Sequence, residues 1–162
     1  MSTVLLILHI IFAGTWISLG IANLIIAGQA AKQRGTFAEL PTMKIQALLG
    51  RVLGSVSGIG ILLTGGAYVG MMHLGWFPFG TLNWLAIKQL DFVILLLLSF
   101  AIMIPKGKKI DVMIASEMAG TNASKGASAE LRKAMGMMRS IGSLMMLLVL
   151  LNIILGEWKP DF

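Results

Sequence analysis

Residues 8–20, LHIIFAGTWISLG, place a histidine inside the first long apolar run of the chain. Ionisable side chains are costly at membrane depth, and those found there usually face the protein interior or a water-filled cavity. His9 is therefore a candidate functional residue, although a histidine that only hydrogen-bonds a neighbouring helix is the simpler alternative. Trp16 follows seven residues later on the same helical face, near the small residues Ala13 and Gly20. We expect this face to meet either a bulky group or another helix.

The composition is that of an integral membrane protein. Of the 162 residues, 57% are hydrophobic and 12% are charged, whereas soluble domains have about 25% charged residues. A membrane-crossing helix needs about 20 apolar residues, and four stretches reach this length, at about residues 3–28, 48–73, 83–105 and 134–156. We therefore predict an all-α, polytopic membrane protein. Its single domain, residues 1–162, is expected to be an antiparallel bundle of four transmembrane helices, the first of them a retained helix rather than a signal peptide.

The basic residues indicate how the helices are oriented. Eleven of the thirteen Lys and Arg residues lie in or beside the first and third connections, and the other two are Lys88 and Lys159. The positive-inside rule then places these two connections in the cytoplasm and both termini outside, in a bacterial-type inner membrane. The net charge of +6 needs no nucleic-acid partner. The expected surroundings are the lipid bilayer, with membrane-protein subunits or further copies of the chain as candidate partners.

Glycines recur in the second apolar stretch. Gly50, Gly54 and Gly58 are spaced by four residues, a spacing that lets two helix backbones approach closely in a membrane. The same spacing would let a flat cofactor approach the helix. Close helix packing and a cofactor wall at Gly54 and Gly58 therefore both remain open.

Histidine and methionine are the candidate metal ligands. The chain has no cysteine, which excludes thiolate metal sites and iron–sulfur clusters. Residues 71–73, MMH, combine soft ligands with an imidazole that suit copper(I), so copper held by His9 and His73 is an alternative. Lys88 is a further candidate, because it can pair with Asp91 three residues later, extend to the outer interface, or point inward at an anionic group.

Several segments resemble one group of membrane proteins. The stretches LHIIFAGTWISLG at 8–20, WLAIKQL at 84–90 and WKPDF at 158–162 are similar to segments of the HemJ-type protoporphyrinogen oxidases and the related CopD-type four-helix membrane proteins. Arg51, fourteen residues before Gly65, is a further match. The resemblance implies a four-helix membrane protein that binds haem b, with His9 as ligand and with Arg51 and Lys88 at other functional positions of the family.

The chain also departs from that family. Residues 21–33, IANLIIAGQAAKQ, replace an arginine-bearing segment that ends in tyrosine and histidine, and QALLG at 46–50 replaces a methionine–glutamate pair. Porphyrinogen oxidation, the HemJ-like activity, is therefore less well supported than the fold.

The resemblance thus implies a haem-b membrane redox protein, and we expect its site to open toward the outer leaflet. The expected cofactor-binding residues are His9, Trp16, Arg51, Gly54, Gly58 and Lys88. A non-catalytic accessory subunit of a larger membrane complex and a CopD-like copper-handling protein are the alternatives.

Overall fold

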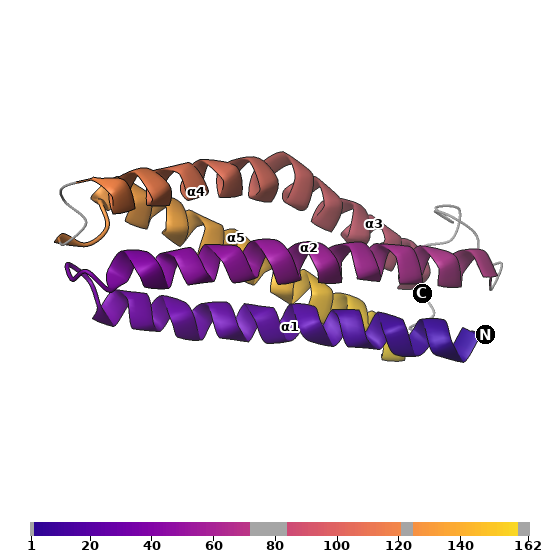
Figure 1. Cartoon of the computed structure of the whole chain (residues 1–162). Helices are drawn as coiled ribbons and strands as arrows, with labels where there is room; N and C mark the ends of the chain where they lie inside the picture. The colour runs from indigo at the N-terminus through magenta and orange to yellow at the C-terminus, as the bar shows by residue number, and fades with distance from the viewer. Residues whose placement is uncertain (1, 72–83, 121–124, 159–162) are drawn as a thin grey trace.

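The computed structural model describes residues 2–71, 84–120 and 125–158, and in these ranges the regular elements are helices. They are α1 (Ser2–Lys32), α2 (Glu39–Met71), α3 (Trp84–Leu97), the π-helical segment η1 (Leu98–Met103), α4 (Ile104–Ala119) and α5 (Ala129–Trp158), as Figure 1 shows. The all-α prediction is confirmed for the described residues. His73 and the aromatic segment around it, at 72–83, lie outside them.

Four of the helical stretches are long and apolar enough to cross a membrane. They are Thr3–Lys32, Glu39–Met71, Trp84–Ala119 and Ala129–Gly156. The chain is therefore a multi-pass membrane protein. Each predicted apolar stretch overlaps one of these helices, and residues 72, 73 and 83 of the predicted stretches lie outside the described residues. The 31 residues of α1 extend over about 46 Å at 1.5 Å per residue, whereas the hydrocarbon core is about 30 Å thick. This helix is therefore long enough to cross the apolar layer and extend beyond it.

Four of the helices form a ring in which each contacts the next, in the order α1, α2, α4, α5 and back to α1. In Figure 1, α1 and α2 lie side by side along their whole length, and α5 contacts α1, α3 and α4, while α4 also contacts α2. The beginning of α1 and the end of α5 lie at one end of the molecule. The turn between α1 and α2 and the start of α5 lie at the other end.

The third long helix bends without ending. Pro105 has no backbone N–H and its ring would crowd the preceding turn of an α-helix. The chain widens into η1 directly before it, where the Ile104 N–H donates to the Ser99 carbonyl five residues earlier. Such a π-helical turn is a known cause of helix bending. Figure 1 shows the resulting bend between α3 and α4. The helix therefore kinks at Pro105 and continues to Ala119.

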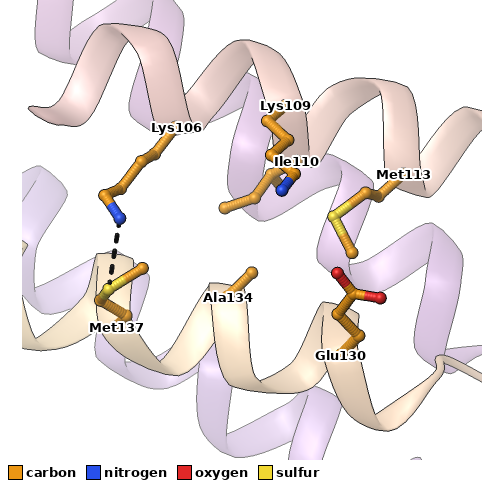
Figure 2. A pocket seen from close by; sticks show the side chains of 7 residues that line it. All are labelled: Lys106, Lys109, Ile110, Met113, Glu130, Ala134 and Met137. Carbon is orange, nitrogen blue, oxygen red and sulfur yellow. Dashed lines mark hydrogen bonds between the residues drawn. The ribbon is translucent and has the colours of Figure 1, made fainter.

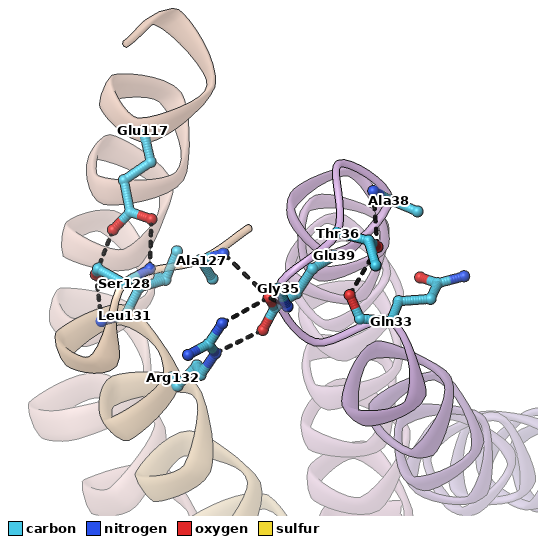
Figure 3. A network of polar contacts seen from close by, with 10 residues as sticks. All are labelled: Gln33, Gly35, Thr36, Ala38, Glu39, Glu117, Ala127, Ser128, Leu131 and Arg132. Atoms are coloured by element: carbon cyan, nitrogen blue, oxygen red, sulfur yellow. Dashed lines mark hydrogen bonds and ion pairs between the residues drawn. The ribbon is translucent and has the colours of Figure 1, made fainter. Parts of the chain in front are cut away.

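Glu39 ties the two connections at one end of the molecule together (Figure 3). Its carboxylate accepts hydrogen bonds from the Gly35 N–H at 2.8 Å and from the Ala127 N–H at 3.1 Å. Gly35 and Gly126 both have positive φ, 78° and 80°, a conformation that glycine adopts without steric cost. Arg132 completes the network with two further donors. This tie holds the α1–α2 turn against the start of α5.

A hydrophobic core lies next to this hydrogen-bond network. It contains apolar side chains of four helices and the segment before α5: Ala30, Leu40, Met43, Ile110, Ile114, Ala127, Leu131 and Met135. Elsewhere many large apolar side chains are exposed, such as Ile25 at 62% and Leu63 at 65%. This is the pattern expected when lipid, rather than water, surrounds the helices. The end of the molecule that contains this hydrophobic core also carries the connections that are predicted to be cytoplasmic.

Candidate functional site

Polar side chains from four helices gather toward the end of the molecule where α1 begins and α5 ends. They are His9 on α1, Thr64 on α2, Lys88 and Asp91 on α3, and Asn152 on α5. Each stands within about two to three turns of the helix end on that side. The topology thus brings together ionisable and hydrogen-bonding groups that are far apart in the sequence.

His9 is held by a threonine of the neighbouring helix. Its Nδ1 lies 2.9 Å from the Thr64 Oγ1, and the Thr64 hydroxyl donates to the Gly60 carbonyl at 2.6 Å. A hydroxyl has one hydrogen, so the proton between the two side chains belongs to Nδ1. A neutral His9 then carries its lone pair on Nε2, the nitrogen that can bind a metal ion or accept a proton.

Glycine at position 65 leaves room for the imidazole. A Cβ at Gly65 would lie 3.2 Å from the His9 Cε1, which is tighter than ordinary van der Waals contact. The buried Thr64 and the adjacent Gly65 therefore act together, because one fixes the ring by a hydrogen bond and the other lets the ring lie against α2. Thr64 was not among the predicted site residues.

Lys88 is a residue of α3, and its side chain lies next to α5. Its Nζ is 5.7 Å from the centre of the Trp84 ring, one helical turn nearer the helix end. A Cβ at Gly156 would lie 2.8 Å from the same Nζ, so glycine at that position makes space for the lysine. The structure therefore places these two predicted site residues at the same end of the molecule, Lys88 next to α5 and His9 next to α2.

Asp91 and Asn152 form the deeper part of the cluster. Asp91 is 4% exposed, and its Oδ2 accepts a hydrogen bond from the Asn152 side-chain amide. Its Oδ1 is buried and accepts no hydrogen bond. This hydrogen bond joins Asp91 on α3 to Asn152 on α5. Asn152 was also missed, although it is the single polar residue in the run LMMLLVLLNIIL at 144–155.

Trp16 and the glycines of α2 pack against each other. A Cβ at Gly58 would lie 2.8 Å from the Trp16 ring, and one at Gly54 would lie 3.6 Å from the Leu19 side chain. Side chains of α1 therefore cover both glycines, as the packing alternative expects. A macrocycle against this face would require Trp16 and Leu19 to move.

Arg51 lies apart from the cluster. It is thirteen residues before Thr64 on α2, or about 20 Å along the helix. Its side chain, 57% exposed, forms an ion pair with Asp111 on α4. The structure therefore does not bring this predicted site residue together with His9.

The cluster contains one histidine nitrogen that could bind a metal, and not a complete set of protein ligands. Within residues 2–71, 84–120 and 125–158, no three His, Cys, Asp or Glu side chains gather in a way that could hold a metal ion. A haem iron takes four ligands from its own macrocycle and needs only axial ligands from the protein. In this cluster the His9 Nε2 is a nitrogen donor of that kind. Comparisons of the chain with protein-family models, with curated proteins and with solved structures give no match.

Proposed function

We propose that this chain is an integral membrane redox protein that binds haem b, with His9 as an axial ligand. The observation that carries the proposal is the hydrogen bond between the His9 Nδ1 and the Thr64 Oγ1, at 2.9 Å. Histidine ligands of metals commonly donate their second ring nitrogen in this way, which fixes the tautomer and the direction of the ring. Thr64 therefore prepares Nε2 as the ligand atom.

The surrounding residues would hold and tune the group. A bound haem b would supply one-electron transfer between its two iron oxidation states. Lys88 is the cationic side chain that we assign to a carboxylate of the macrocycle, and Trp84 and Gly156 lie next to its Nζ. The resemblance to the HemJ-type and CopD-type proteins supports the same assignment of His9 and Lys88. The resemblance also points to Arg51, but we leave it out of the proposed haem site, because it pairs with Asp111 about 20 Å along α2 from Thr64.

We also propose an orientation for the bundle. In an antiparallel four-helix arrangement, the end that carries His9, Lys88 and Asp91 faces outside, and both termini lie on that side. The asymmetry of the basic residues supports this choice, because Lys106, Lys125, Arg132 and their neighbours lie at the opposite end. A bacterial-type inner membrane is the setting in which this rule applies. The haem would then lie near the outer leaflet.

The test is the visible spectrum of the purified protein, oxidised and then reduced with dithionite. We expect a Soret band and the sharp reduced bands of a b-type haem in the unaltered chain. His9→Ala should remove or shift these bands. Added imidazole should restore them, because a small molecule can replace a lost ligand but cannot replace a lost packing contact. Unaltered bands in His9→Ala at full haem occupancy would reject the ligand assignment.

Thr64→Val gives a second, graded test. Valine keeps the shape of threonine but cannot accept the Nδ1 proton. Loss of the hydrogen-bond partner of a ligating histidine typically weakens metal binding 10- to 100-fold. We therefore expect lower haem occupancy in Thr64→Val, although His9 is still present as a ligand. Gly50→Ala is the matched control on the same helix, because a Cβ at Gly50 meets nothing within 4 Å.

An accessory subunit of a larger membrane complex is the second candidate. The observation that favours it is open space at Gly14 and Gly28 on α1, where an added Cβ would meet nothing within 4 Å. Fourteen residues are close to four helical turns, so both glycines lie on one face, and small residues let a partner helix approach. This candidate predicts a colourless protein whose Gly14→Leu variant leaves its complex on a native gel. A colourless protein that retains copper would instead favour the copper-handling alternative.

A further inference from the structure

A groove runs between α4 and α5 at the end of the molecule opposite His9. Its volume is about 110 Å³, and it is lined by Lys106, Lys109, Ile110, Met113, Glu130, Ala134 and Met137. Figure 2 shows Lys106 and Met137 at one end of the groove and Glu130 beside Met113 at the other. The groove thus combines two ammonium groups with an apolar floor.

The two lysines carry charge that the described residues do not neutralise. The Lys106 Nζ donates to the Met137 Sδ at 3.5 Å, and a thioether is a weak acceptor. In residues 2–71, 84–120 and 125–158, the ion pairs are those of Arg51 and Arg132, and neither involves the groove. Lys106 and Lys109 are three residues apart and therefore lie on one face of α4. Two cations face one groove without a carboxylate bound to either.

The groove lies where lipid headgroups are expected. Lys106 follows Pro105, where the predicted apolar stretch ends, so it stands at the border between the apolar layer and the cytoplasmic extension. On α5, Leu144 lies seven residues beyond Met137, on the same helical face and toward the membrane, and it is 48% exposed. An acyl chain can therefore follow this face of α5 while its headgroup sits in the groove.

We propose that this groove binds the headgroup of an anionic glycerophospholipid of the cytoplasmic leaflet. Its phosphate would lie between Lys106 and Lys109, because basic pockets between transmembrane helices on the cytoplasmic side suit such headgroups. Glu130 lies two helical turns before Met137, away from Lys106, and its carboxylate can accept hydrogen bonds from headgroup hydroxyls. This arrangement favours phosphatidylglycerol over a headgroup that carries a second phosphate near Glu130. The proposal does not depend on haem binding.

The experiment measures lipid binding to the full chain in detergent micelles. Phosphatidylglycerol or phosphatidylcholine is titrated into the protein, and bound lipid is counted by native mass spectrometry. We expect phosphatidylglycerol to bind more tightly than phosphatidylcholine. In Lys106→Gln/Lys109→Gln this preference should fall about tenfold or more, since each lysine near a lipid surface contributes about fivefold.

Lys108→Gln is the matched control. Lys108 lies on the same helix and is exposed, but it does not line the groove. Its variant loses the same unit of charge as each groove substitution and should keep the preference for phosphatidylglycerol. Lys106→Arg/Lys109→Arg should keep it as well, which separates loss of charge from misfolding. The single variants Lys106→Gln and Lys109→Gln are compared with Lys108→Gln. If Lys108→Gln loses as much of the preference for phosphatidylglycerol as either of them, the proposal is overturned, because the lipid then responds to the overall surface charge and not to the groove.

Inorganic phosphate distinguishes a lipid site from a site for a soluble anion. If the acyl chain contributes, millimolar phosphate should not displace phosphatidylglycerol. Complete displacement by phosphate, or equal binding of phosphatidylcholine, would overturn the lipid assignment.

Discussion

Arg132 on α5 and Glu39 on α2 form a bidentate ion pair between two parts of the chain that are 93 residues apart. The Arg132 Nε lies 2.7 Å from Oε1 and its Nη2 lies 2.8 Å from Oε2. Glu39 is 1% exposed, so this carboxylate depends on Arg132 and on the backbone donors of Gly35 and Ala127. One side chain therefore fixes the relative positions of the α1–α2 turn and the start of α5.

Glu39→Gln should destabilise the protein. The substitution keeps the size of the side chain but removes its charge, which leaves Arg132 next to a poorer acceptor. Breaking a buried ion pair by changing one partner typically costs about 3 kcal/mol or more. We expect a loss of this order in the free energy of unfolding, measured by denaturant titration in detergent. The exposed Glu130→Gln is the control and should stay within about 0.5 kcal/mol of the unaltered chain.

The same carboxylate predicts a loss of stability in acid. Glu39 precedes the apolar stretch that begins at about residue 48, and the two hydrogen bonds from Arg132, together with those from Gly35 and Ala127, lower its pKa from 4.5 to about 2. The unfolded chain therefore binds a proton near pH 4.5 while the folded chain does not. Stability should fall from about pH 4.5 and level off below about pH 2, by about 3 kcal/mol in total. A Glu39→Gln variant with an equally steep loss over this range would contradict the assignment to Glu39.

Two glycines of α2 should respond in opposite ways to the same substitution. A Cβ at Gly60 would overlap the Phe12 ring, whereas one at Gly50 meets nothing within 4 Å. Gly60→Ala should therefore cost about 1 to 3 kcal/mol through overpacking. Gly50→Ala should be neutral or stabilising by up to about 1 kcal/mol, since alanine favours a helix. Thermal unfolding in detergent measures both, and equal midpoints would show that α1 does not pack on α2 as described.

The proposed orientation is testable with single cysteines, because the chain has none of its own. Lys125→Cys lies in the third connection, and Gly80→Cys lies in the second, outside the described residues. A membrane-impermeant maleimide added to intact cells should label Gly80→Cys. It should label Lys125→Cys only after the membrane is permeabilised. Labelling of both from the same side would contradict the number of membrane crossings.

The sequence predicted the helices better than it predicted their contacts. Apolar length alone located the four membrane-crossing stretches, because lipid imposes one simple requirement on each. It also selected His9 and Lys88, since ionisable groups are rare in such stretches. It could not show that Arg51 pairs with Asp111, far along α2 from His9, because that depends on which faces of the helices meet.

The partners of the site residues were harder to predict for a related reason. Thr64 is inconspicuous in a glycine-rich helix, and its role follows only from the close approach of α1. Glu39 also escaped prediction, since a glutamate near a helix start is usually solvated. Its burial results from the two glycine turns that fold around it. Such contacts arise from tertiary packing, which periodicity does not encode.

A hydrogen bond between Asp91 and Asn152 joins α3 to α5 inside the predicted membrane layer. A buried carboxylate with one oxygen lacking a hydrogen bond carries a desolvation cost. Asp91→Asn removes that charge, keeps the size of the side chain and keeps an oxygen that can accept from Asn152. We therefore expect it to leave the free energy of unfolding unchanged or to raise it by about 1 kcal/mol. Asn152→Leu removes the donor and leaves both Asp91 oxygens unpaired, so it should cost about 1 to 3 kcal/mol. Thermal unfolding of the two variants in the same detergent compares them directly. If Asp91→Asn proves as damaging as Asn152→Leu, the negative charge itself is required at this position and must be balanced by a cation in the folded protein.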